Sequence, residues 1–262
     1  MRRIAAALAA VLALGVAAPA LATPAPDRGP TSAASDVRAK GPLSGIVIAL
    51  DPGHQLGNSN PRFRRQLAQT RWNGTIVKGC NTSGTATNSG YPESTFTWKV
   101  ANRLRVRLEA LGATVRMTRS TNSYDAWGPC TWDRGKFGRK VGARLMVSIH
   151  ADGSAPSGRG FFVIAPGSLK GWTDDIARPS QRLARDLIAG MTKAGATPST
   201  YIRNQLLVWK DQNTLNFSDV PTVIVELGNM RNASEARLMA SSSGQKQYAD
   251  WLLAGIRRNL RR

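Results

Sequence analysis

The chain has 262 residues, of which 42% are hydrophobic, so it is long enough and apolar enough to bury a full core. Its 36 Lys and Arg residues outnumber 16 Asp and Glu residues, which gives a formal net charge of +20. This charge favours anionic partners such as nucleic acid, lipid headgroups or acidic cell-wall polymers, but it identifies no reaction. Beyond the N-terminal segment, no stretch approaches the length of a transmembrane helix, so the sequence predicts no membrane-spanning domain.

The first 22 residues have the pattern of a secretory signal peptide. Arg2 and Arg3 form a positive start, residues 4–18 are apolar, and residues 20–22 form a cleavage site of the A-x-A type. An uncleaved N-terminal anchor is the alternative, although the apolar run is short and rich in Ala for a membrane span. No Cys follows the cleavage site, so we do not expect a lipid-anchored form. We therefore predict export to the periplasm, the cell wall or the medium.

After the signal peptide, residues 23–43 are rich in Pro, Ala, Ser and Gly, and we expect a flexible lead-in to one domain at residues 44–262. A buried strand is expected at residues 46–50, which are all apolar. Asp51, Pro52 and Gly53 then favour a tight bend. The segment that follows, residues 55–91, has almost no periodic pattern of apolar residues. It is also too long for an ordinary connection between two elements. We therefore expect a functional or disulfide-tethered loop there.

The two cysteines, Cys80 and Cys130, lie in sequence rich in Gly, Asn, Thr and Pro. In an exported protein we expect one disulfide that joins two surface loops. Closing a loop of this length stabilises the folded state by about 4 kcal/mol in the chain-entropy model. The alternative is a pair of thiolate ligands for zinc, but neither cysteine has a Cys or His neighbour at ligand spacing.

Strands alternate with helices through the rest of the chain. The expected elements are a helix at 92–111, a strand at 113–117, a helix at 133–143, strands at 145–150 and 160–165, a helix at 181–193, an edge strand at 206–208, a strand at 222–226, and two closing helices. Asn232 and Glu235 form a variant of the capping box at the start of the first closing helix. No internal repeat is present, and no second globular domain fits. The pattern predicts an α/β fold: a single domain with a twisted, largely parallel sheet flanked by helices.

The chain contains two histidines, and both come at the ends of expected buried strands. His54 follows the first strand, His150 ends the strand at 145–150, and Glu226 ends the last strand. A single histidine at a strand end is more often structural than a ligand, but side chains at the carboxyl ends of parallel strands converge at one edge of the sheet. Two imidazoles and one carboxylate are a common catalytic zinc set that leaves a fourth position for water. The sequence therefore predicts a metal site.

Four carboxylates are candidates for this site: Asp51, Glu93, Asp152 and Glu226. Asp51 and Asp152 flank the histidines, and each could equally cap a turn or hydrogen-bond a ligand. Glu93 could equally be a helix-start charge that interacts with the helix dipole. Glu226 is the hardest to explain structurally, because a carboxylate directly after a buried strand is costly unless it is paired or functional.

Three segments carry a family resemblance: Leu-Asp-Pro-Gly-His at 50–54, Val-Ser-Ile-His-Ala-Asp at 147–152, and Val-Ile-Val-Glu-Leu-Gly-Asn-Met-Arg-Asn at 223–232. In this order they resemble the zinc-dependent N-acetylmuramoyl-L-alanine amidases of the AmiC-like (Amidase_3) type, over about residues 45–260. The resemblance implies hydrolysis of the amide between N-acetylmuramic acid and L-alanine of the peptidoglycan stem peptide, in cell-wall remodelling or recycling. It implies His54, Glu93 and His150 as ligands of Zn²⁺, and Glu226 as the catalytic glutamate.

This sequence departs from the common pattern of that family after the first histidine, and it lacks room for an insertion that some relatives carry. The common pattern continues with two glycines after the histidine, whereas Gln55 and Leu56 follow His54 here, and the connection to Glu93 is unusually long. This departure concerns the rim of the cleft rather than the metal set. Some relatives carry an inserted helix that plugs the zinc until a partner removes it, and residues 164–181 leave little room for one. We therefore expect an open site, no activator protein and a monomer.

Two other classes of function remain as alternatives. A non-catalytic basic module that binds the cell wall would use the same positive surface, but it would not need His54, His150 and Glu226. An exported metal-dependent nuclease would also suit the charge, but the chain lacks a carboxylate-rich cluster for Mg²⁺. We therefore expect peptidoglycan and anionic envelope polymers as partners, and no specific nucleic acid.

Overall fold

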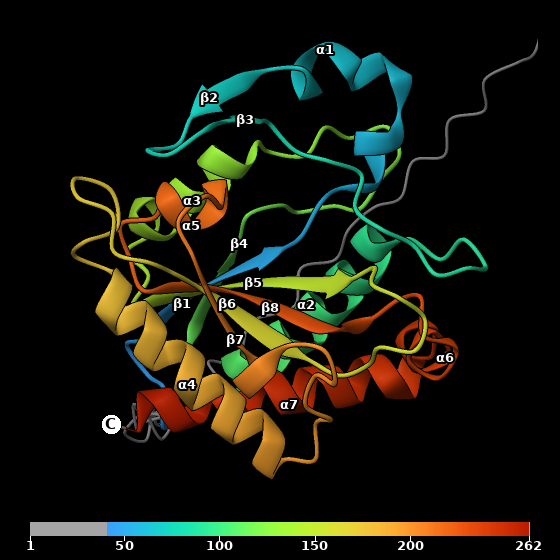
Figure 1. The fold of residues 1–262 in the computed structure, drawn as a ribbon. Helices are drawn as coiled ribbons and strands as arrows, with labels where there is room; N and C mark the ends of the chain where they lie inside the picture. Colours follow the sequence, from blue (N-terminus) through green and yellow to red (C-terminus); the bar gives the residue numbers. More distant parts are fainter. Residues whose placement is uncertain (1–40, 262) are drawn as a thin grey trace, which may run out of the picture. The chain divides into compact units, whose positions relative to one another are not determined.

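The structure is a computed structural model that describes residues 41–261 (Figure 1). The predicted signal peptide and most of the predicted lead-in lie outside the described residues. Within residues 41–261, no helix combines the length and the hydropathy of a membrane span. Leu43, at the end of the predicted lead-in, is buried in the core, and its N–H donates to the carbonyl of Leu111 at 2.9 Å. The last residues of that segment are therefore part of the packed domain.

A six-stranded sheet with the order β4-β1-β5-β8-β6-β7 forms the centre of the domain (Figure 1). In that order the strands are Thr114–Met117, Val47–Pro52, Leu145–Asp152, Thr222–Asn229, Phe162–Pro166 and Leu206–Trp209. Neighbouring strands are parallel except for β8 and β6, which are antiparallel. The predicted α/β class and largely parallel sheet are confirmed, and β7 lies at an edge as predicted.

The strands that carry the candidate site run further than the sequence predicts. Pro52 is expected to stop β1, but it lies in the strand opposite Ile149 of β5. A proline lacks only its own N–H, and the N–H of Gly53 continues the ladder by donating to the carbonyl of Ile149 at 2.9 Å. Likewise β5 continues to Asp152 and β8 to Asn229. All the candidate side chains except that of Glu93 consequently lie in these strands or within two residues of their ends.

Helices cover both faces of the sheet (Figure 1). On one face lie α2 (Glu93–Ala110), α4 (Ala177–Lys193) and α7 (Ser242–Leu260), and on the other lie α3 (Thr131–Lys140) and α5 (Asn213–Asn216). Four apolar side chains on one face of α2 are fully buried: Phe96, Val100, Leu104 and Leu108. Leu111, which the sequence places on the same face, follows the end of the helix and is only partly buried. Burial of each such side chain stabilises the fold by about 1.5–3 kcal/mol, so α2 is firmly fixed against the sheet.

The start of α6 (Ala233–Ala240) agrees with the sequence in part. Asn232 caps the helix as predicted, because its side chain accepts the N–H groups of Ser234 and Glu235 at 3.2 and 3.3 Å. Glu235 does not complete a capping box. Its carboxylate accepts instead the N–H groups of Gly160 and Asn229, at 2.9 and 2.8 Å, and so ties the end of β8 to the start of β6.

The segment between β1 and α2, predicted as a long loop, contains short elements. They are the 3-10 helices Leu56–Ser59 and Pro61–Phe63, α1 (Arg64–Leu67), and a hairpin of β2 (Thr70–Trp72) and β3 (Val77–Gly79). Elements of three or four residues are too short to leave a periodic pattern in the sequence. The predicted disulfide is present: Cys80, directly after β3, is bonded to Cys130 with a Cα–Cα distance of 4.5 Å. Both sulfurs are therefore unavailable as zinc ligands.

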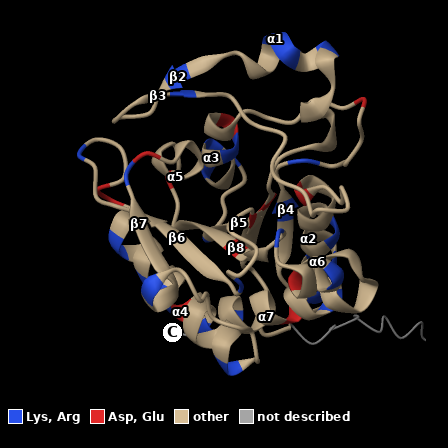
Figure 2. Cartoon of the chain, turned by 45° about the vertical axis from the view of Figure 1, so that its right-hand side comes forward, with Lys and Arg blue, Asp and Glu red and all other residues tan. Residues whose placement is uncertain are grey.

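The hairpin is anchored at its tip as well as at its base. The side chain of Asn73 donates to the carbonyl of Asp211 at 3.0 Å and to the side-chain oxygen of Asn213 at 2.9 Å. In return, Asn216 donates to the carbonyl of Asn73 at 2.8 Å. With the disulfide at Cys80, these bonds make the hairpin a wall above α3 and α5 (Figures 1 and 2).

Positive charge is spread over the domain rather than gathered in one place. Figure 2 shows Lys and Arg on α1, α3, α4, α6 and α7. The excess of basic residues in the sequence is therefore a property of the general surface, which agrees with their scattered positions along the chain.

Candidate metal centre and active-site cleft

The structure brings His54, Glu93 and His150 together, as the sequence predicts. His54 lies two residues beyond β1, Glu93 is the first residue of α2, and His150 lies near the end of β5. The carboxylate of Glu93 lies between the two rings: Oε2 is 3.3 Å from Nε2 of His54, and Oε1 is 3.0 Å from Nδ1 of His150. Each residue offers one ligand atom, and all three atoms lie within 4.8 Å of one another. They could therefore share one metal ion.

Glu93 is held by the backbone around it. Its side chain is almost fully buried, and its two oxygens accept the N–H groups of Thr85 at 2.9 Å and Ala151 at 3.2 Å. Burial raises the pKa of this carboxyl group, but the positive charge and hydrogen bonding of the His54 and His150 rings outweigh it and hold the pKa below its usual range. Glu93 is consequently ionised and held in a fixed orientation.

His54 is oriented by an unusual backbone and by one hydrogen bond. Its φ of 58° lies in the left-handed region, which few non-glycine residues adopt. Its Nδ1 lies 2.9 Å from the carbonyl of Thr82, which is an acceptor, so Nδ1 carries a proton. Nε2 faces the carboxylate of Glu93 and is the ring nitrogen that could bind a shared metal. Metal-binding histidines commonly donate their second ring N–H in this way. The preceding Gly53 is also required, because a Cβ there would collide with the ring of His150.

The donor set fits zinc. Two imidazole nitrogens and one carboxylate oxygen are typical of catalytic zinc sites, which keep a fourth position open. The same set does not suit Mg²⁺, which prefers oxygen ligands and octahedral geometry. The backbone carbonyl of Thr82 and the backbone N–H groups around Glu93 supply the hydrogen bonds that orient such ligands.

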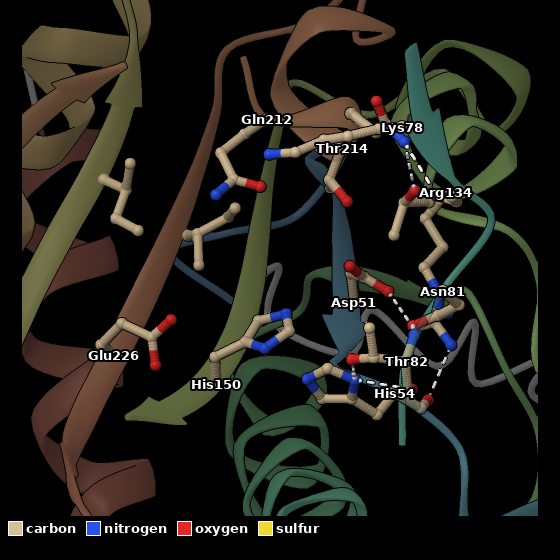
Figure 3. Close-up of a pocket in the computed structure, with 15 residues that line it drawn as sticks. Asp51, His54, Lys78, Asn81, Thr82, Arg134, His150, Gln212, Thr214 and Glu226 are labelled. Carbon is tan, nitrogen blue, oxygen red and sulfur yellow. Dashed lines mark hydrogen bonds and ion pairs between the residues drawn. The ribbon is translucent and has the colours of Figure 1, made fainter. Parts of the chain in front are cut away.

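Glu226 lies beside the three candidate ligands without joining them. It is in β8, directly opposite His150 in the register of β5 and β8, and Figure 3 shows its carboxylate pointing toward that ring. Its Oε2 atom is shielded from solvent and has no hydrogen-bond partner among residues 41–261. Burial, together with the like charges of Glu93 and Asp152, raises its pKa well above its usual range. A carboxyl group with a raised pKa holds a proton more readily than an ordinary one, as a general acid must.

Asp51 has a structural role. It is fully buried, and its two oxygens accept hydrogen bonds from Thr118 and Ser148, each at 2.6 Å, and from the guanidinium of Arg134 at 2.7 Å. Burial raises its pKa, but Arg134 and the two hydroxyl groups more than offset this and hold the pKa at about 2. Both of its oxygens are thus engaged within the fold, and the structure does not place Asp51 among the candidate metal ligands.

Two buried arginines fix the turn that presents His54, and sequence reasoning did not identify either of them. Arg134 of α3 donates to the carbonyls of Pro52 and His54 at 2.8 and 2.7 Å. Arg119 donates to the carbonyls of Pro52 and Gly53 at 2.9 and 3.3 Å. Burial and the nearby charge of Arg134 lower the pKa of Arg119 to about 9. The left-handed conformation of His54 is thus maintained by charged donors far away in the sequence.

Asp152, the last flanking carboxylate, also has partners within the fold. One of its oxygens accepts the hydroxyl of Tyr201 at 2.9 Å, and the other accepts the N–H of Gly153 at 2.7 Å. The structure therefore places Asp152 at the rim of the site, where its charge acts on Glu226.

Two cavities meet at the ligands. The first, called here the hairpin cavity, measures about 360 Å³ and reaches Lys78 and Gly79 of β3 (Figure 3). The second, called here the arginine cavity, measures about 590 Å³ and reaches Arg231. Both are lined by His54, Thr82, His150 and Glu226. A substrate that crosses the candidate metal centre would therefore extend into a cavity on each side of it.

Comparisons with known proteins agree with this geometry. The model of the Amidase_3 family, N-acetylmuramoyl-L-alanine amidase, matches residues 48–258. The chain is 38% identical over 215 residues to the N-acetylmuramoyl-L-alanine amidase Rv3717 of Mycobacterium tuberculosis, a match that covers 82% of this chain and 86% of that protein. Two solved structures of the N-acetylmuramyl-L-alanine amidase Ami1 are also similar. At 35% identity, the enzyme of Mycobacterium smegmatis gives a TM-score of 0.75 over 83% of this chain and 98% of its own. The enzyme of Mycobacterium abscessus, also 35% identical, gives a TM-score of 0.76 over 83% of this chain and 100% of its own.

Proposed function

The chain belongs to the Amidase_3 family of N-acetylmuramoyl-L-alanine amidases, and on this premise we propose that it uses one zinc ion to hydrolyse the amide between N-acetylmuramic acid and L-alanine of the stem peptide. Peptidoglycan is the substrate class of the family. The observation that supports the proposal most strongly is the convergence of His54, Glu93 and His150 beside a carboxyl group, that of Glu226, whose buried Oε2 is unpartnered.

His54, Glu93 and His150 would hold the metal, each through one atom. When bound, zinc polarises the scissile carbonyl and lowers the pKa of a bound water. The chain supports this chemistry by holding its ligands still. The carbonyl of Thr82 keeps the proton of His54 on Nδ1, and the N–H groups of Thr85 and Ala151 fix the carboxylate of Glu93.

Glu226 is the proposed general base and general acid. It takes the proton of the attacking water and then gives it to the nitrogen of the leaving L-alanine. The raised pKa of its carboxyl group suits both steps, because a carboxylate with an ordinary pKa is a weak acid catalyst at neutral pH.

The cleft needs no activator in this proposal. The segment from Gly167 to Ile176, where a plugging helix would lie, forms turns instead of a helix. No residue between Pro166 and Gln181 lines either cavity. We expect the purified chain to reach full activity alone. Strict dependence on an added partner protein would contradict this expectation.

The proposed setting is the cell envelope. Export would follow from the signal peptide predicted at residues 1–22, and the surface charge would favour anionic envelope polymers. The alternative wall-binding module and nuclease share this setting, but neither accounts for the arrangement of Glu226 beside a zinc-type ligand set.

Digestion of purified peptidoglycan tests the proposal. The full chain, loaded with zinc, should release free stem peptides that begin with L-alanine, identified by mass spectrometry. Zinc content should approach one per chain, chelation should abolish the release, and added zinc should restore it. Plasmid DNA incubated in parallel should stay intact. Peptidoglycan that is bound but not cleaved would support the wall-binding module, and nicked plasmid without free peptides would support the nuclease.

A further inference from the structure

Arg231 is a cation of the active-site cleft that the proposed chemistry does not use. It lies in the arginine cavity with Glu226 and Asp152, just after β8. Its guanidinium donates to the side-chain oxygen of Asn88 at 3.0 Å, which is a neutral partner. Among residues 41–261 it forms no ion pair, whereas Arg134 is paired with Asp51 at 2.7 Å. The side chain is therefore positioned, but its charge is not neutralised.

The backbone that carries Arg231 is rigid. Its N–H donates to the side-chain oxygen of Asn229 at 2.9 Å. Asn229 is fully buried, and its side-chain nitrogen donates to the carbonyls of Ala155 and Gly158 at 2.8 and 2.9 Å. A binding side chain on such a fixed base loses little conformational freedom when it meets its ligand.

The hairpin cavity has a different chemical character. It contains two cations, and both are already paired: Lys78 with Asp211 at 3.6 Å, and Arg134 with Asp51. Apart from Asp51, which pairs with Arg134, and the residues shared with the candidate metal centre, the rest of its wall is neutral and includes Asn81, Thr131, Gln212, Thr214, Ile164 and Ile224. Neutral amide and hydroxyl groups beside an apolar surface suit a ligand with hydroxyl and acetamide groups and no charge.

We propose that the cleft is directional: the neutral muramyl sugar lies in the hairpin cavity, and the stem peptide lies in the arginine cavity with one of its carboxylates bound by Arg231. This inference rests on the proposed function. Once the lactyl group is in amide linkage, the sugar carries no charge, whereas the stem peptide carries carboxylates. Arginine binds a carboxylate through two parallel N–H donors, and only the arginine cavity offers a cation without an acidic partner.

The reach of the peptide fits this assignment. An extended chain advances about 3.3–3.6 Å per residue, so the second and third stem residues lie within about 10 Å of the scissile nitrogen. The arginine cavity of about 590 Å³ begins at His150 and Glu226 and includes Arg231. Two carboxylates are candidates: the α-carboxyl group of the second residue, which is a γ-linked glutamate, and the carboxyl group of the third residue.

Four synthetic substrates distinguish the two candidate carboxyl groups. Each is N-acetylmuramoyl-L-Ala-γ-D-Glu-L-Lys, with the α-carboxyl group of Glu and the terminal carboxyl group of Lys each either free or amidated. We expect the wild-type chain to cleave the substrate with both groups free with a kcat/KM about 10- to 100-fold above that of the doubly amidated one. The singly amidated substrates show which carboxylate Arg231 binds.

Variants then connect the preference to the residue. Arg231→Gln should cleave all four substrates equally, at the rate of the wild-type chain on the doubly amidated one, and Arg231→Lys should keep part of the preference because it keeps the charge without the fork. Arg237→Gln, an exposed arginine of α6 outside both cavities, should behave as wild type. Gln212→Ala in the hairpin cavity should lower kcat/KM on all four substrates by one common factor.

Several outcomes would overturn the proposal. Equal cleavage of the four substrates by the wild-type chain would show that no carboxylate is recognised. A preference that survives in Arg231→Gln would assign recognition to another residue, and a preference that changes in Gln212→Ala would contradict the placement of the sugar. A zinc-loaded wild-type chain that cleaves none of the four would contradict the proposed function itself.

Discussion

Strands β1 and β8 each carry a carboxylate near the same edge of the sheet, and the two differ in almost every other respect. Asp51 in β1 accepts hydrogen bonds from a guanidinium and two hydroxyl groups, and its pKa falls to about 2. Glu226 in β8 has an oxygen with no partner, and burial beside Glu93 and Asp152 raises its pKa. A carboxylate whose oxygens are hydrogen-bonded stabilises the scaffold. A carboxylate with an unpartnered oxygen is costly to keep, and it is therefore a candidate for a catalytic role.

The largest expected effect separates the two carboxylates by activity. Glu226→Gln should lower amide hydrolysis by several orders of magnitude, because the variant has no group to take and return the proton. Its zinc content and its melting temperature should stay at the wild-type level, since the amide avoids burying a charge. Turnover of peptidoglycan, metal analysis and thermal unfolding check the three statements. Glu109→Gln, an exposed glutamate of α2, is the matched control and should remain fully active.

Near-wild-type turnover of Glu226→Gln would remove this residue from the catalytic role. Loss of zinc together with activity would instead make it a structural neighbour of the metal site.

The next effect concerns the scaffold. Arg134→Met should lower the free energy of unfolding by about 3–5 kcal/mol, because it leaves the buried Asp51 without its cation. Urea unfolding in the presence of a chelator measures this without a contribution from metal binding. Arg105→Met, which breaks the exposed i,i+4 pair with Glu109, should change stability by less than about 0.5 kcal/mol. Equal effects of the two substitutions would contradict the structural role assigned to the Asp51–Arg134 pair.

The wall of the cleft depends on a covalent bond rather than on a buried ion pair. The double variant Cys80→Ser, Cys130→Ser should unfold with a free energy lower by about 4 kcal/mol, because a disulfide across 50 residues restricts the unfolded chain. Wild-type protein in reducing agent should match the variant, and the variant itself should not respond to reduction. If the variant is as stable as oxidised wild type, the disulfide contributes nothing to the fold.

The smallest expected effect is the pH dependence of the Asp51 contribution. Because the pKa of Asp51 is lowered from 3.8 to about 2 on folding, its charge stabilises the native state above about pH 4, and this stabilisation is lost as the pH falls toward 2. The stability gap between wild type and Asp51→Asn should therefore shrink by about 2 kcal/mol between pH 7 and pH 2. Urea unfolding at several pH values, with a chelator present, follows the gap. A gap that is constant over this range would contradict the shifted pKa.

Much of the site could be predicted because its residue types are rare and their positions are regular. The chain has two histidines, each at the end of an apolar run, and the carboxyl ends of parallel strands meet at one edge. Glu93 could be included through the resemblance, and the structure brings it to both imidazoles.

Other parts of the site leave no signal in the sequence. Arg134 is 80 residues from His54, and nothing in the pattern of α3 distinguishes it from Arg139, the exposed arginine of that helix. Arg231 is recognisable as a cation of the cleft only in the structure, where it contacts Asn88, 143 residues earlier in the chain. The hairpin is likewise held by its bonds to two asparagines of the distant α5 rather than by an alternating strand pattern.

The sequence by itself determined the α/β order of elements, the buried strands and the positions of His54, His150 and Glu226 along the chain, because hydrophobic period and residue type are local properties. Only the tertiary structure decided which carboxylate is satisfied and which is free, how the turn at His54 is held, and where the two cavities lie. Those properties depend on groups that meet across the sheet, and the balance of burial and charge at one carboxylate is a sum over neighbours that the linear order does not contain.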